Sequence, residues 1–159
     1  MLTLRIITIG TLKESYWRDA VAEYKKRLGG FCRVEEINLK ESKLPDDPSP
    51  AQIAAALDAE GEAMKEYLTP RAYKIALCVE GKQFSSEQLA ARIDEVSARA
   101  SEICLVIGSS HGIAPSIKQM CDLKLSFSAL TFPHQLARVV LYEVLYRCMN
   151  IIKGTKYHK

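Results

Sequence analysis

The sequence predicts an α/β fold, in which a mainly parallel sheet carries helices on both faces. Short apolar runs alternate with longer amphipathic segments, so that a strand followed by a helix recurs five times. Runs such as Leu4–Ile9 and Ile103–Ile107 are almost continuously apolar, which is typical of strands covered on both faces. The chain has 159 residues, of which 48% are hydrophobic and 26% charged. This size and composition predict a single domain spanning residues 1–159.

Hydrophobic periodicity identifies each element in turn. The strands are short apolar or alternating runs, whereas the helices repeat their apolar residues at three- and four-residue steps. Gly29 and Gly30 end the first helix, and a loop with three prolines over residues 40–50 precedes the second. Strands are predicted at 4–9, 34–39, 73–79, 103–107 and 123–127, and helices at 16–28, 53–68, 89–100, 115–120 and 136–152.

The stretch Leu123–Arg147 contains the most unusual connection. It begins as an alternating strand, passes through the small polar segment Ser128–Thr131, and reaches Phe132–Pro133 before a long helix. Proline suits the first helical position because its missing N–H would be unpaired there. A helix N-terminus after a loop of small hydroxyl residues is a common arrangement for holding a small anionic or polar ligand. A simple turn between a strand and a helix fits the same periodicity.

Ligands of parallel α/β sheets bind beyond the carboxyl ends of the strands. Three loops of this chain occupy such positions: Glu80–Lys82, Gly108–Gly112 and Ser128–Thr131. The Gly108–Gly112 loop, GSSHG, matches neither the dinucleotide-binding fingerprint nor the phosphate-binding P-loop. Its two glycines permit a close backbone approach, but many tight turns share this pattern.

Charge and cysteine content narrow the class of protein. Residues 101–159 contain seven Lys and Arg against three Asp and Glu, which indicates an anionic partner such as RNA or simply a soluble surface. The five cysteines form no C-x-x-C pair and favour reduced thiols in a cytoplasmic protein, without a metal site. No apolar run approaches the roughly 18 residues that span a bilayer, so no membrane association is expected. The first ten residues fit a strand better than a secretory signal.

The end of the chain combines an apolar helix with a basic aromatic tail. Apolar residues cover a wide arc of the helix, and its predicted polar side consists of Arg138, Glu143, Arg147 and Asn150. Such an arc predicts either a homodimer interface or a completely enclosed helix. In the tail, Tyr157 and His158 lie between lysines, which suits stacking on a base and contact with phosphates. Disorder is also typical of a chain terminus.

The segment Leu125–Arg147 and the terminal Tyr157–Lys159 resemble the ribosomal RNA large subunit methyltransferase H family. These are small members of the SPOUT (trefoil-knot) methyltransferases, and the resemblance extends over essentially the whole chain. It implies a C-terminal trefoil knot and a cytoplasmic homodimer. It also implies transfer of a methyl group from S-adenosylmethionine to N3 of a pseudouridine in the helix 69 loop of 23S rRNA, within the assembled ribosome.

The resemblance also assigns residues to the site. Cofactor contacts fall on Leu77, Gly108, Phe127, Ser128, Ala129, Leu130, Thr131 and Phe132. For catalysis we expect Tyr157 and His158 of one subunit to position the base over the cofactor loop of the other. Lys159 and Arg138 would contact phosphate or the ring oxygens. The family usually has a second glycine where this chain has Ser109, and a glutamine where it has Val144.

Two other functions fit parts of the pattern. A nucleotide-dependent oxidoreductase shares the strand–helix alternation, but the glycine fingerprint after the first strand is missing. A non-catalytic RNA- or ribosome-binding module explains the basic C-terminus and leaves the polar loop before Pro133 without a purpose.

Overall fold

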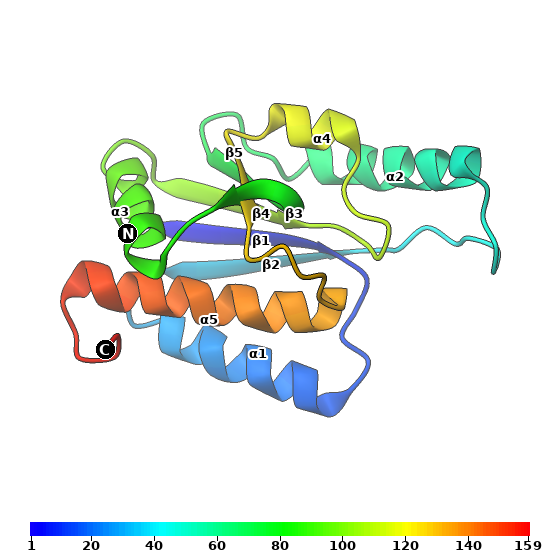
Figure 1. Cartoon of the computed structure of the whole chain (residues 1–159). Helices are drawn as coiled ribbons and strands as arrows, with labels where there is room; N and C mark the ends of the chain where they lie inside the picture. Colours follow the sequence, from blue (N-terminus) through cyan, green and yellow to red (C-terminus); the bar gives the residue numbers. More distant parts are fainter.

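The computed structural model describes residues 1–159 and confirms the alternation of strands and helices (Figure 1). A five-stranded sheet, in which all strands are parallel, has the order β2-β1-β4-β3-β5. The elements are β1 (Thr3–Ile9), α1 (Ser15–Leu28), β2 (Arg33–Leu39), α2 (Pro50–Lys65), β3 (Tyr73–Gln83), α3 (Ser86–Ser97), β4 (Glu102–Ile107), α4 (Pro115–Met120), β5 (Leu123–Ser126) and α5 (His134–Lys153).

Two hydrophobic layers cover the two faces of the sheet, as predicted. Helices α1, α3 and α5 pack on one face in a cluster of 20 buried residues, and α2 and α4 pack on the other in a cluster of 11 (Figure 1). Alternate residues of the interior strand β1 belong to the two clusters, with Leu4 and Ile6 on one side and Ile7 and Ile9 on the other. Burial on both faces explains why these strands are continuously apolar. None of the helices combines the length and apolarity needed to cross a membrane.

The predicted polar side of the last helix is wrong at two positions. Arg138 and Asn150 are buried, with 4% and 3% of their surface exposed. Helix α5 lies between the sheet, α1 and α3, so side chains on several of its faces are enclosed. Asn150 is accommodated by donating to the carbonyl of Tyr146 at 2.7 Å and accepting from the Thr155 hydroxyl at 2.5 Å.

Strand β3 continues four residues beyond the predicted end at Val79 and curls around β5 (Figure 1). Leu125 in β5 is paired with Leu77 before the curl and with Lys82 after it. Gly81 permits this contact, because a Cβ atom there would lie 2.7 Å from backbone atoms of Lys124 and Leu125. The end of β3 is therefore held against the strand that leads into the unusual connection.

Candidate cofactor and active site

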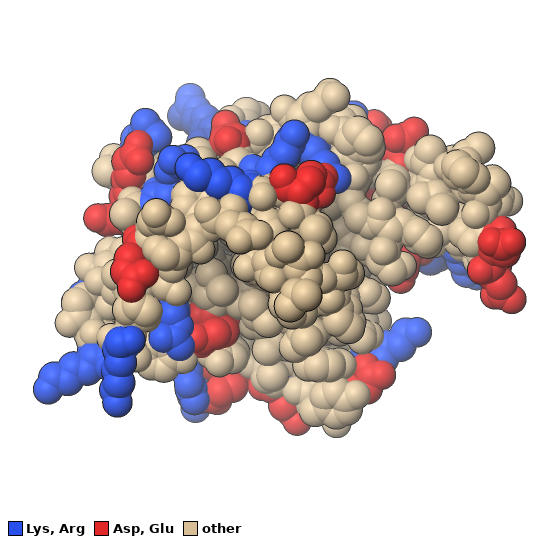
Figure 2. All heavy atoms as spheres, viewed as in Figure 1, with Lys and Arg blue, Asp and Glu red and all other residues tan.

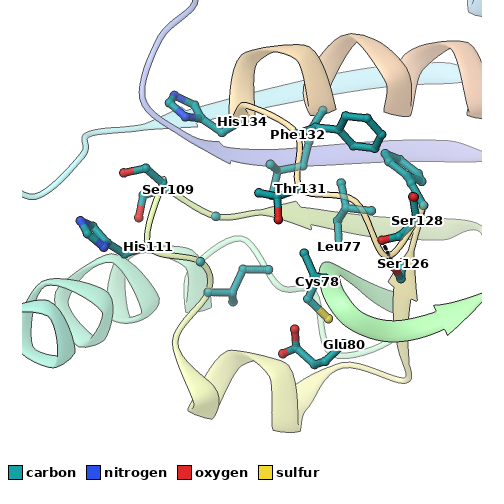
Figure 3. Close-up of a pocket in the computed structure, with 18 of the residues that line it drawn as sticks. Leu77, Cys78, Glu80, Ser109, His111, Ser126, Ser128, Thr131, Phe132 and His134 are labelled. Atoms are coloured by element: carbon teal, nitrogen blue, oxygen red, sulfur yellow. Dashed lines mark hydrogen bonds between the residues drawn. The ribbon is translucent and has the colours of Figure 1, made fainter. Parts of the chain in front are cut away.

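A cavity of about 330 Å³ opens at the carboxyl edge of the sheet, where β4 and β5 end and β3 begins its curl (Figure 3). All three loops flagged from the sequence contribute to its walls, together with the first turn of α5. Such convergence follows from the parallel sheet, since neighbouring strands deliver their carboxyl ends to one edge.

The loop after β4 is shaped by close backbone packing. Gly108 is buried, and a Cβ atom at this position would lie 2.1 Å from the carbonyl oxygen of Gly112. Gly112 has a φ of +99°, a conformation that favours glycine, and its N–H donates to the Ser109 carbonyl at 2.9 Å. Ser109 itself is 8% exposed. The serine at this position is therefore accommodated in a tight turn whose shape depends on the glycines on either side.

The loop after β5 is organised by its own hydroxyl groups. Ser126 Oγ donates to the Ser128 carbonyl at 3.0 Å, and Ser128 Oγ accepts from the backbone N–H of Leu130 at 3.0 Å. The chain then enters α5 through Pro133, which is the N-cap residue rather than the first helical residue. No side chain caps this helix, so the N–H groups of its first turn lack a side-chain acceptor.

The floor of the cavity contains an ion pair and a thiol. Glu80 at the curl of β3 accepts a hydrogen bond from Lys118 of α4, and this bond holds the pKa of Glu80 below its usual value. Cys78 lies beside them, and burial raises the pKa of its thiol (Figure 3). Apolar and polar groups are thus both present in one enclosure, as is usual for small-molecule sites.

A family model described as "Predicted SPOUT methyltransferase" matches residues 2–158 of this chain. The chain belongs to the SPOUT methyltransferase family. It is 45% identical to "Ribosomal RNA large subunit methyltransferase H" of Streptococcus thermophilus (strain CNRZ 1066), over 99% of this chain and 100% of that protein. Proteins of the same name from Bifidobacterium adolescentis and Leuconostoc mesenteroides are 43% and 42% identical over the same shares.

The SPOUT family uses S-adenosylmethionine, and the cavity fits this cofactor. Gly108 lines the cavity, and its lack of a Cβ lets the Gly112 backbone pack directly against it, which shapes this wall. Nine of the 20 lining residues are hydrophobic, which suits an adenine ring, while hydroxyl and backbone groups are available to the polar parts of the cofactor. Seven of the eight predicted cofactor residues line the cavity: Leu77, Gly108, Phe127, Ser128, Leu130, Thr131 and Phe132.

Ala129 is the exception among the predicted cofactor residues, because it is exposed and does not line the cavity. Eight lining residues were missed by sequence reasoning, and three of them, Lys118, His134 and Ala137, lie on helices α4 and α5. For the last two a signal was present. They lie one and four residues after Pro133, so they belong to the first turn of the helix that the flagged loop enters.

The four predicted catalytic residues do not meet the cavity of their own chain. The tail residues Tyr157, His158 and Lys159 follow the far end of α5, which has 20 residues. The tail folds back along α5 only as far as Glu143, which lies ~14 Å along the helix from its first residue, and no tail residue lines the cavity. Tyr157 and His158 instead lie on α5 and α3 of their own chain.

Arg138 lies near the cavity but is enclosed behind it. Its guanidinium donates to the carbonyl oxygen of Gly10 at 3.1 Å and to Asn38 Oδ1 at 3.3 Å, while its Nε has no partner. Burial lowers the pKa of this guanidinium from its ordinary value. A direct contact between Arg138 and RNA would therefore require it to leave these partners. In the present arrangement it ties the start of α5 to the ends of β1 and β2.

No group of three or more His, Cys, Asp or Glu side chains is arranged to hold a metal ion.

Proposed function

We propose that this SPOUT methyltransferase modifies N3 of a pseudouridine in the helix 69 loop of 23S rRNA, acting on the assembled ribosome. It would do so as a homodimer in the cytoplasm. The observation that carries the proposal is the single cavity formed by three strand-end loops, in a chain 42–45% identical to relatives named for ribosomal RNA methylation.

Methyl transfer requires the protein mainly to align the reacting atoms. Bound S-adenosylmethionine would supply a methyl group already activated by the positive sulfur. The loop from Phe127 to Phe132 and the turn at Gly108 would hold the cofactor and exclude water from it. The residues that orient the base must keep its N3 in line with the methyl group, and the N3 proton must also be removed.

The basic tail is the chain's best candidate for contact with RNA. Lys153, Lys156 and Lys159 are exposed around the C-terminal end of α5. Figure 2 shows Lys and Arg side chains gathered at this end of the molecule, with acidic side chains among them. Lysines that bind phosphates contribute affinity and position without reading the base sequence.

A homodimer would bring the tail and the cavity together. Leu136, Val140 and Val144 are only partly buried and follow one another at four-residue steps along α5. Residues at this spacing form a stripe along one side of a helix. Antiparallel packing of two such stripes would place the C-terminal end of one α5 beside the N-terminal end of the other. The tail of one subunit would then lie next to the cavity of its partner.

The proposal is tested by methyl transfer from radiolabelled S-adenosylmethionine to three substrates: assembled ribosomes, isolated large subunits and protein-free 23S rRNA. We expect label on the assembled ribosome alone. Methylation at N3 blocks the pairing edge of the base, so reverse transcription should stop at the helix 69 loop. Label at another site would contradict the proposed target. Ribosome binding without transfer would instead indicate a non-catalytic ribosome-binding module.

A further inference from the structure

The C-terminal tail is docked on its own subunit by a specific set of contacts. The Tyr157 hydroxyl donates to Glu143 Oε2 at 2.8 Å. The Tyr157 ring lies edge-on to Tyr146, with centroids 4.7 Å apart, and Arg147 lies 4.7 Å from its centroid. Glu143 also binds Arg147, whose Nε donates to Glu143 Oε1 at 2.8 Å. One carboxylate therefore orients both the tyrosine and the arginine that covers its ring.

His158 is held through both ring nitrogens. Its Nε2 lies 2.7 Å from Glu87 Oε1 at the start of α3, and its Nδ1 lies 3.3 Å from Arg147 Nη1. A guanidinium can only donate hydrogen bonds, so Nδ1 must be the acceptor and carries no proton. The proton of the neutral ring is then on Nε2 and is donated to Glu87. The hydrogen bond from His158 accordingly lowers the pKa of the Glu87 carboxyl.

We propose that Glu87 and Glu143 are positioning residues that fix the His158 tautomer and the direction of the Tyr157 hydroxyl before RNA arrives. In this docked tail neither nitrogen of His158 is free to accept a proton. His158 therefore shapes the tail and does not serve as the general base. We call the contacts of Glu87 and Glu143 with the tail the clamp. Its role in catalysis rests on the proposed function, in which the tail completes the partner's site. The clamp itself is a property of the isolated protein.

The tautomer can be measured without any substrate. The chain has three histidines, so a long-range ¹H–¹⁵N spectrum contains few ring signals, and H158Q assigns those of His158. We expect the Nε2–H pattern in the wild-type protein. Glu87→Ala should give a mixture of tautomers, whereas Glu87→Gln should keep the pattern because its amide oxygen still accepts. An Nδ1–H or doubly protonated His158 in the wild type would overturn the clamp.

Activity on ribosomes then tests the positioning role. Misplacement by about 1 Å can cost on the order of 100-fold in rate, so we expect Glu87→Ala and Glu143→Gln to lower kcat by about 10- to 100-fold. Affinity for S-adenosylhomocysteine should stay within twofold of the wild type, and Glu87→Gln should recover most of the activity. Glu95→Ala is the matched control, since Glu95 is an exposed glutamate of α3 that pairs with Arg99 at 3.0 Å. We expect it to change neither measurement.

Two results would separate the clamp from the proposed function. Wild-type kcat in Glu87→Ala, with its tautomers mixed, would show that the clamp exists but does not position the tail for catalysis. A wild-type protein that transfers no methyl group to ribosomes would overturn the proposed function, while the spectra would still decide whether the clamp exists.

Discussion

The hydroxyl of Tyr142 in α5 donates a hydrogen bond to the carboxylate of Glu36 in β2, which joins the last helix to an edge strand of the sheet. Tyr142 is completely buried, and this burial together with the carboxylate raises the pKa of its phenol. The phenol therefore stays protonated, as a donor to Glu36 requires. The second oxygen of Glu36 accepts from Lys25 of α1 at 2.9 Å, so the same carboxylate also connects α1 with α5.

Replacing Tyr142 by phenylalanine should destabilise the fold. The substitution removes the donor to a charged acceptor, and we expect the free energy of unfolding to fall by about 1–3 kcal/mol. Urea denaturation at a fixed protein concentration measures this change. Tyr16→Phe is the control, because Tyr16 is 62% exposed and should leave the midpoint unchanged. Equal midpoints for both variants would show that the buried bond contributes nothing.

Replacing Gly108 by alanine should impair cofactor binding. The new Cβ would meet the Gly112 carbonyl oxygen at 2.1 Å, so the turn must open and its backbone must leave the cavity wall. We expect calorimetry to show a loss of at least about tenfold in S-adenosylhomocysteine affinity, equivalent to about 1.4 kcal/mol. Gly30→Ala is the control, since its Cβ would have no neighbour nearer than 3.6 Å. Unchanged affinity with an intact circular dichroism spectrum would remove Gly108 from the site.

Deleting Tyr157–Lys159 should abolish methyl transfer to ribosomes and leave cofactor binding intact. These residues follow the far end of α5 and contribute nothing to the cavity of their own chain. A filter assay with labelled cofactor measures transfer, and calorimetry measures binding. Full activity of the truncated protein would contradict the proposal that the tail completes the partner's site.

The cysteines should differ in their response to bound ligand. Cys78 lines the cavity, whereas Cys121 is also partly buried but lies outside it. Burial raises the pKa of Cys121 to about 11, so only about one molecule in a thousand carries this thiolate at pH 8. Burial raises the pKa of Cys78 as well, so alkylation of both thiols should accelerate as the pH rises.

Peptide mass spectrometry after iodoacetamide treatment measures each rate. We expect S-adenosylhomocysteine to slow alkylation of Cys78 at least threefold and to leave Cys121 unaffected. Equal protection of both thiols would indicate a general tightening of the fold rather than a ligand in the cavity.

Placing a charge in the stripe of α5 should separate the subunits. Val140 lies in the middle of the stripe, and Val140→Glu would bring two carboxylates together across an antiparallel contact. Light scattering should give twice the 17.8 kDa of the chain for the wild type and a single chain for the variant. Ala22→Glu on the exposed side of α1 is the control and should remain dimeric. A monomeric wild type would exclude the composite site.

Local patterns were sufficient to predict the order of elements and the place of the cavity. Glycines after β4 and small hydroxyl residues after β5 mark loops, and parallel strands must bring such loops to one edge. The burial of Arg138 could not be predicted in this way. Helical periodicity shows how wide the apolar arc of a helix is, but not how many neighbouring elements enclose the helix. The docking of His158 was equally hidden, since its partner Glu87 lies 71 residues away on another helix. The cofactor and the RNA target came from the family resemblance alone.

The curl of β3 around β5 also has a consequence for how the protein is made. The turn at Gly81 is synthesised more than forty residues before Leu125, the residue that it must enclose. The cavity wall includes Ala137, so the site cannot exist until this part of the chain has emerged during translation. A nascent chain therefore cannot complete the cofactor cavity until Ala137 has left the ribosome, well after the curl of β3 has been made.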